Sequence, residues 1–239
     1  MVLLFVFLLT IVASFIQRVS GFGFGIFVMM FFPFFLPSYG ESVMLSGLLA
    51  GSTALMIAVK NGKYIRWKMM GWVVFFNVLF SFLATEYMRS MSNSTLKQCL
   101  GVMLILIALY FFFGEGRMGK IFKSKPAQVT IGSISGIMGG MFAMPGPPIV
   151  LYCISTLENK REYVTTLQAF SVVLNVFYTF FRAKAGFYSD DTWLCWVIGI
   201  GGAVIGSSLG ERCFEIISNR MLKLIVYGMM IISGLVAIL

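Results

Sequence analysis

The chain has 239 residues, of which 59% are hydrophobic and only 11% are charged, and it carries 25 Phe and 17 Met. This composition is too apolar for an ordinary soluble domain and predicts an integral membrane protein embedded in a lipid bilayer. The net charge of +9 comes from Lys and Arg in short loops, where orientation signals belong, so we expect no nucleic-acid partner. Because the chain has no histidine and its four cysteines stand singly, we expect neither a metal nor a cofactor.

Apolar runs of about 20 residues, the length that crosses a hydrocarbon core ~30 Å thick, follow one another along the chain. Six runs are long enough to span, and the exceptions are two glycine-rich pairs at 1–37 and 128–157. In the second pair, the arm "PPIVLYCISTL" measures only about 17 Å as a helix, so it cannot cross unaided. The predicted segments are 1–17, 22–37, 43–60, 69–88, 97–114, 128–142, 146–157, 165–182, 192–210 and 221–239.

The two halves of the sequence repeat each other. The stretch "SGFGFGIFVMMFFP" begins at Ser20 and "SGIMGGMFAMPGPP" begins at Ser135, and they share the initial Ser-Gly, a glycine at the sixth position and a final proline. We predict a first repeat at 1–114, a basic cytoplasmic linker at 115–127 and a second repeat at 128–239. The expected fold is an all-α polytopic membrane protein with two inverted repeats, each a glycine-rich broken-helix hairpin plus three spanning helices.

The loop charges favour inversion of the second repeat. If each glycine-rich pair is a hairpin with no net crossing, three spanning helices follow it and the second copy is upside down. Most loop Lys and Arg residues then lie on one side, at 60–68, 115–125, 158–162 and 211–223, with 89–97, 182–184 and Arg18 on the other. A parallel arrangement divides the charges more evenly. The positive-inside rule therefore predicts inverted repeats, with both chain ends outside the cytoplasm.

The glycine-rich pairs are candidates for a binding site. Non-helical backbone at membrane depth is tolerated only where it is buried in protein or lines a wet cavity. The second arm of a hairpin begins at its tip, so its free N–H groups point into the protein and favour an anion. In the second repeat we expect this arm to begin at Gly146, because Pro147 and Pro148 suit a first helical turn. In the first repeat, Pro33 either kinks the arm or marks a later start. The alternative is that the glycines only allow close helix packing.

A polar stripe runs along the segment at 165–182. Gln168, Ser171, Asn175 and Tyr178 follow the three- and four-residue spacing of one helix face. Such a stripe either lines a pathway or forms hydrogen bonds to neighbouring helices, and the sequence does not choose between these.

Two charged residues are further candidates. Arg18 precedes the first glycine stretch and either approaches the hairpin tip, where a charge signals function, or extends to the membrane surface. Glu41 lies near a segment end and is expected to be solvated, yet it is the best candidate carboxylate for proton coupling. The predicted substrate-binding residues are Arg18, Ser20, Gly21, Gly23, Gly25, Ser135, Gly139, Gly140, Pro145, Gly146, Gln168 and Asn175.

The two glycine motifs, one in each half and each followed by three spanning segments, resemble the TauE/SafE sulfite-exporter family of membrane permeases over nearly the whole chain. The resemblance implies an inner-membrane permease for small anions, with sulfite, organosulfonates and related sulfur or carboxylate compounds among the substrates. Many family members have a more compact glycine run before the proline, whereas phenylalanines separate the glycines of the first motif here. This departure affects the substrate more than the fold.

We therefore expect a secondary transporter of small anions that works by alternating access, with an anion channel as the alternative. No nucleotide-binding motif is present, so the energy source is expected to be an ion gradient, with H⁺ or Na⁺ as the coupling ion, the substrate gradient or a separate subunit. A membrane-embedded enzyme is disfavoured because the sequence has no histidine base and no clustered carboxylates at membrane depth. The sequence leaves open the direction of transport and the formation of a homodimer.

Overall fold

The computed structural model describes residues 1–114, 124–157, 159–213 and Leu235, and this part of the chain contains helices and no strands. The first half holds α1 (Val2–Ser20), α2 (Phe24–Met29), α3 (Phe32–Phe35), α4 (Tyr39–Lys60), the short turns η1 (Gly62–Tyr64) and η2 (Trp67–Met69), α5 (Gly71–Met88) and α6 (Asn93–Gly114). The second half holds α7 (Lys125–Phe142), α8 (Gly146–Thr156), α9 (Lys160–Lys184) and α10 (Asp190–Cys213). An all-α fold is confirmed.

Five helices of the described chain are long and apolar enough to cross a membrane, namely α1, α4, α5, α9 and α10. Four of them match predicted spanning segments. The fifth, α1, was expected to be one arm of a hairpin, yet its 19 residues are sufficient for a span by length and composition. The apolar part of α6, Asn93–Leu109, is shorter than these five helices. The predicted segment at 221–239 lies outside the described residues, apart from Leu235.

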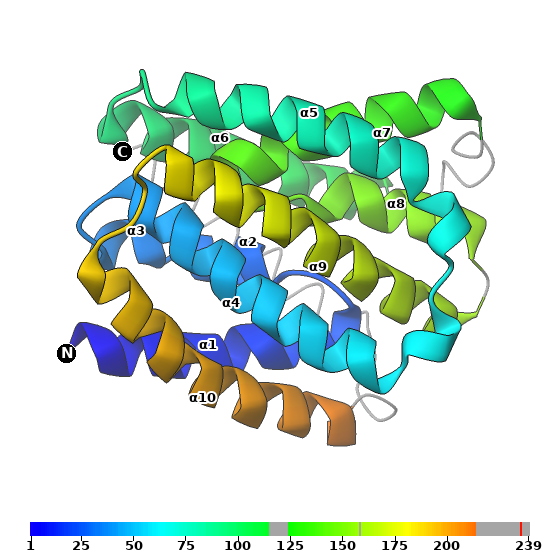
Figure 1. Ribbon diagram of the computed structural model, residues 1–239, viewed down its shortest axis with the longest axis horizontal. Coiled ribbons are helices and arrows are strands. Elements are labelled where there is room, and N and C mark those ends of the chain that lie inside the picture. Colours follow the sequence, from blue (N-terminus) through cyan, green and yellow to red (C-terminus); the bar gives the residue numbers. More distant parts are fainter. Residues whose placement is uncertain (115–123, 158, 214–234, 236–239) are drawn as a thin grey trace.

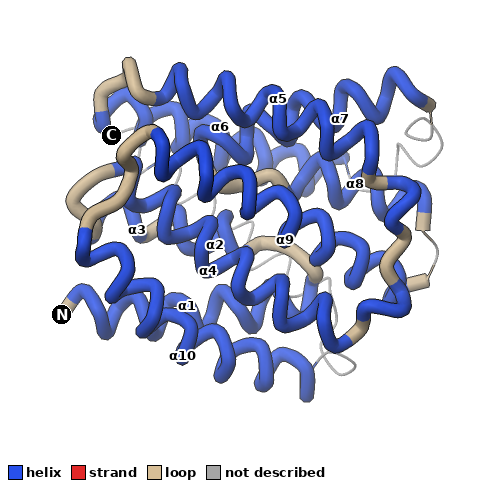
Figure 2. The backbone as a smooth tube through the Cα atoms, viewed as in Figure 1, coloured by secondary structure: helices blue, strands red, loops and turns tan. Residues whose placement is uncertain are grey.

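The helices lie roughly along one direction and alternate in sense (Figure 1). In that view α1, α4 and α10 run from left to right, and α5, α7 and α9 run from right to left. The chain reverses direction after α1 and again after α7. Both reversals lie toward the middle of the molecule, whereas the other described loops lie at its two ends (Figure 2).

Glycine stripes bring two pairs of helices into close contact. On α7, Gly132, Gly136 and Gly140 face the backbone of α5, and a Cβ at each would come within 2.7 Å of a carbonyl oxygen. On α10, Gly202 and Gly206 face the backbone of α1 in the same way. Glycines four residues apart form one helix face and let two backbones approach, as small residues do between membrane helices. These glycines therefore serve helix packing.

The two helix breaks have a different local chemistry. At the first, Gly21 and Gly23 have φ values of 85° and 101°, a left-handed conformation that glycine adopts without strain. At the second, Ala143 has a φ of 56°, and Pro145 precedes the first residue of α8. Gly146 begins α8 as predicted, with prolines in its first turn. In the first repeat the arm begins at Phe24, and Pro33 lies in the first turn of the separate helix α3.

Candidate functional site

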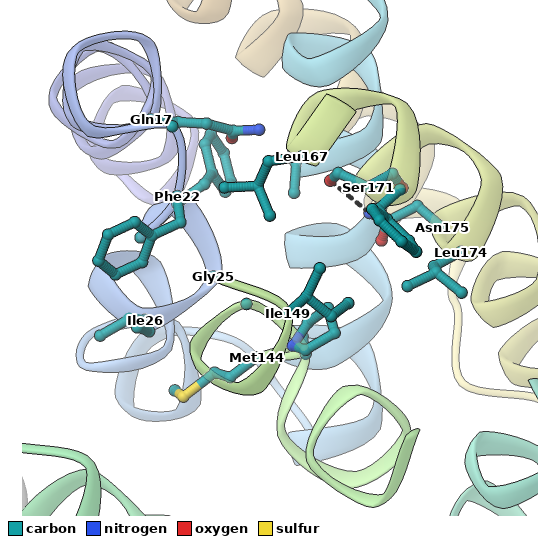
Figure 3. A pocket seen from close by; sticks show the side chains of 18 residues that line it. Gln17, Phe22, Gly25, Ile26, Met144, Ile149, Leu167, Ser171, Leu174 and Asn175 are labelled. Carbon is teal, nitrogen blue, oxygen red and sulfur yellow. Dashed lines mark hydrogen bonds between the residues drawn. The ribbon is translucent and has the colours of Figure 1, made fainter. Parts of the chain in front are cut away.

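The tips of the two broken helices meet inside the bundle. Gly25, in the first turn of α2, lies against the break that follows α7, where a Cβ on Gly25 would be 2.1 Å from the carbonyl oxygen of Ala143. In Figure 3, Gly25 lies where the blue ribbon of the first hairpin approaches the green ribbon of the second. Only glycine has the space for such an approach of two backbones. The two breaks therefore form one shared region.

A hydrogen-bond network holds the second tip. The Ser135 hydroxyl on α7 donates to the Pro145 carbonyl at 2.7 Å and accepts a hydrogen bond from the Asn77 amide of α5 at 2.9 Å. The Tyr178 hydroxyl of α9 donates to the Asn77 Oδ1 atom at 2.6 Å. Ser135, Asn77 and Tyr178 are all fully buried. A satisfied buried network of this kind fixes one arrangement of the groups that it joins, here the second tip against α5 and α9.

The first tip is also bonded to α9. The Gln168 Nε2 atom donates to the Gly21 carbonyl at 2.8 Å, and the Gln17 Nε2 atom donates to the Gln168 Oε1 atom at 2.7 Å. The Ser20 hydroxyl contacts the carbonyls of Ile16 and Phe22 and so ties the turn to the end of α1. One helix, α9, thus bonds directly to the first break and supports the second through Asn77 and Ser135.

A cavity of about 60 Å³ lies between the tips. Its walls come from both breaks, from Gln17 and Ala50, from Ile149 on α8 and from one face of α9 that includes Ser171 and Asn175. Figure 3 shows apolar side chains around most of this space, with the hydrogen-bonded pair Ser171 and Asn175 on the α9 side. A water molecule needs ~15 Å³ by the same measure, so the cavity has room for roughly four waters or one compact anion.

Backbone N–H groups at the first tip are available to a ligand. Phe24, Gly25 and Ile26 all line the cavity, and their N–H groups lie in the first turn of α2, where no intrahelical acceptor exists. Among the described residues none accepts a hydrogen bond from these three groups. The second tip is poorer in donors, because Pro147 and Pro148 have no N–H. The polar groups that face the cavity therefore come mostly from the first tip and α9.

Apart from Arg18, the predicted site residues form three groups. Those that line the cavity are Gly21, Gly23, Gly25, Pro145, Gly146 and Asn175. Ser20, Ser135 and Gln168 hold the tips through the hydrogen bonds described above. Gly139 and Gly140 do neither, because they lie inside α7 and pack against the Tyr178 hydroxyl and the backbone of α5, respectively. Their role as ligands stays a prediction.

Arg18 lies near the end of α1 but does not line the cavity. Its guanidinium is 3.5 Å from the Glu211 carboxylate of α10, which also pairs with the Lys60 ammonium at 2.6 Å. Arg18 therefore belongs to the same end of the bundle as Lys60, not to the opposite side where the charge count placed it. In the first turn of α9, the Glu162 carboxylate pairs with Arg66 and raises the pKa of that guanidinium. An anion-binding role for Arg18 stays a prediction.

Glu41 lies away from the central cavity, in the first turn of α4. It lines a second cavity of about 280 Å³ together with Pro37 and Asp191. Its carboxylate accepts a hydrogen bond from the Ser189 hydroxyl at 3.2 Å. Ala50, the residue of α4 that lines the central cavity, is nine positions further along, or about 13 Å of helix. Proton coupling through Glu41 stays a prediction.

Arg182 is a candidate that the sequence analysis missed. It is the last residue of the predicted segment 165–182 and was counted with the loop charges at 182–184, but it lies inside α9 and its side chain is fully buried. Its guanidinium donates to the carbonyls of Val43 on α4 and of Gly139 and Gly140 on α7. Arg182 is four residues beyond Tyr178, so the spacing of the polar stripe on α9 extends to it. That periodicity was the signal available in the sequence.

One comparison with known proteins identifies a family. A family model described as "Sulfite exporter TauE/SafE" matches residues 6–237. No curated protein and no solved structure matches this chain. The match covers both broken helices and the spanning helices described above, apart from the first four residues of α1. The apolar helices and this match together make the chain a multi-pass membrane transporter and not an enzyme, a member of the TauE/SafE sulfite exporter family.

Proposed function

We propose that this protein is a secondary transporter that binds one small anion, sulfite, an organosulfonate or a related sulfur or carboxylate compound, in the cavity between the two hairpin tips. The observation that carries the proposal is the shared lining of that cavity. Residues from the first break and from the second, distant in sequence, enclose one space at the level where both helices are interrupted. Interrupted helices in transporters commonly provide substrate sites of this kind.

The chemistry of the lining suits an anion held by backbone donors. Phe24, Gly25 and Ile26 of the first tip and Gly146 of the second line the cavity and carry N–H groups, whereas the Asn175 amide already donates to Ser171. Backbone N–H groups bind oxyanions well when water is excluded, because the low dielectric of the interior strengthens each hydrogen bond. The small volume favours a compact oxyanion such as sulfite over a bulky organic sulfonate.

The helix arrangement supports alternating access by two inverted repeats. Exchanging the halves pairs α1 with α7, α4 with α9 and α5 with α10, and in Figure 1 the members of each pair run in opposite directions. The close contact of α1 with α10 then corresponds to that of α7 with α5. In this proposal one repeat moves against the other about the shared cavity, in the inner cell membrane, with H⁺ or Na⁺ as candidate coupling ions.

Reconstitution in liposomes tests the proposal. Purified protein is incorporated and uptake of radiolabelled sulfite, a two-carbon sulfonate and a small carboxylate is measured, with and without imposed pH and Na⁺ gradients. We expect saturable uptake of at least one anion and counterflow against unlabelled substrate. Flux without saturation or counterflow would identify an anion channel instead. Folded protein that moves none of the three anions would contradict the proposal.

A further inference from the structure

Arg182 is a buried cation without a counter-ion in the described part of the chain. Its side chain is fully buried, and its Nη atoms donate to three neutral carbonyl groups, including that of Val43 at 2.9 Å. No carboxylate of the described residues lies within ion-pair distance of it. Its Nε atom is buried and has no hydrogen-bond partner among those residues. Within the described part of the chain, the positive charge has no carboxylate partner and the Nε donor has no acceptor.

The charge lies beside the central cavity. Ser171 and Asn175, which line the cavity, share the helix face that leads to Arg182. Helical side chains lean toward the helix N-terminus, so the Arg182 guanidinium reaches back toward Asn175. The Arg182 Nη1 atom and the Asn175 Oδ1 atom both lie against Gly47 of α4. A Cβ on Gly47 would be 2.5 Å from the first atom and 3.1 Å from the second. The guanidinium and the cavity-lining amide are therefore neighbours.

A purely structural role explains part of this arrangement. Gly139 and Gly140 are in the last turn of α7, and a cation near the last carbonyls of a helix stabilises its negative end. The Tyr178 ring, 5.3 Å from the guanidinium, adds a cation–π contact. A helix cap would work equally well if a carboxylate also paired with the arginine. A buried charge without such a partner is costly in a membrane protein, so the cap alone does not explain why none is present among the described residues. It also leaves the Nε donor unused.

We propose that Arg182 is the residue that makes the cavity selective for anions. Carbonyl groups hold its guanidinium beside Asn175, and its positive charge compensates the negative charge of a substrate bound between the tips. The inference rests on the proposed function and adds the specificity-determining group that the cavity lining itself lacks, since its described residues include no charged side chain. With an effective dielectric constant of ~20 and a separation of ~6 Å, one such charge changes anion affinity by on the order of a hundredfold.

The test leaves Arg182 in place and neutralises its charge locally. Asn175→Asp puts a carboxylate next to the guanidinium, whereas Asn175→Leu removes the same amide donor without adding charge. Sulfite affinity and uptake are measured for both variants and the wild type in liposomes. We expect Asn175→Asp to bind sulfite at least tenfold more weakly than Asn175→Leu while unfolding at the same or a higher temperature, because the new ion pair keeps the α7 cap.

A second pair of variants addresses the charge directly. Arg182→Lys keeps the positive charge and loses the guanidinium fork, whereas Arg182→Met loses both. We expect Arg182→Lys to retain more than a tenth of the wild-type sulfite affinity and Arg182→Met to retain less. Equal sulfite affinity in Asn175→Asp and Asn175→Leu, with active wild type, would overturn the inference and leave the proposed function intact. A folded wild type that neither binds nor moves sulfite, the sulfonate or the carboxylate would overturn both.

Discussion

The contact between the two hairpin tips makes Gly25→Ala a sharp perturbation. The added methyl carbon would be 2.1 Å from the Ala143 carbonyl oxygen, well below the 3.0 Å that real Cβ contacts respect. The atom that it meets is backbone, so the two tips must separate by about 1 Å. Overpacking of this kind costs about 1 to 3 kcal/mol, which corresponds to a melting temperature lower by roughly 2 to 12 °C for a chain of this size.

Gly146→Ala is the matched control for this change. It adds the same methyl group at the other tip of the same cavity, where the nearest atom is the Phe22 Cβ at an ordinary 3.6 Å. Thermal unfolding in detergent and sulfite uptake in liposomes are measured for both variants. We expect Gly25→Ala to lose stability and at least tenfold in uptake, because the N–H groups beside Gly25 shift with the tip, and Gly146→Ala to unfold near the wild-type temperature. If the two variants unfold at the same temperature, the tips do not touch as described.

Three further predictions concern the supports of the site and the topology. Gln168→Met leaves the buried Gly21 carbonyl and Gln17 amide without their partner, so we expect a loss of about 1 to 3 kcal/mol in the free energy of unfolding. An unchanged denaturation midpoint would contradict the role of α9 at the first tip. Tyr178→Phe removes the hydrogen bond to Asn77 and should destabilise the protein by about 1 kcal/mol or more. The control is Tyr188→Phe at a half-exposed site, which should change stability by less than about 0.5 kcal/mol in the same unfolding assay. In a background without native cysteines, Lys63→Cys and Ser94→Cys should react with an impermeant thiol reagent from opposite sides of the membrane, and labelling of both from one side would refute the inverted topology.

Much of the fold could be predicted because apolar run length is a local property. The helices from Tyr39 to Met88 and from Lys160 to Cys213 follow segments that hydropathy alone identifies. The two breaks were also expected, and so was the start of α8 at Gly146, but the position of the first break within its glycine motif was not. The glycine motifs align Gly21 with Gly136, yet the first break includes Gly21, whereas the second comes about two helical turns further along its motif, at Ala143. Glycine marks both tight turns and close helix packing, and a single sequence does not separate these uses.

The charged residues were harder to place for a physical reason. An arginine near the end of an apolar run ordinarily extends to the membrane surface, so Arg182 was counted with the loop charges. Its partners are backbone carbonyls on α4 and α7, and these leave no side-chain signal in the sequence. Arg18 was counted on the wrong side for a related reason, since its partner Glu211 is almost a whole chain away. The corrected positions remove Arg182 from the loop charges and move Arg18 to the basic side, so the charge asymmetry becomes stronger.

The most direct test of the central claim is substrate protection of a cysteine placed in the cavity. Ser171→Cys is made in a background without native cysteines and reconstituted in liposomes, with Ser133→Cys, on α7 away from the cavity, as the control. We predict that a small thiol reagent blocks sulfite uptake by Ser171→Cys, that added sulfite slows this block in proportion to occupancy, and that Ser133→Cys remains active. Active Ser171→Cys protein that is labelled equally fast with and without saturating sulfite would contradict a substrate site between the two tips.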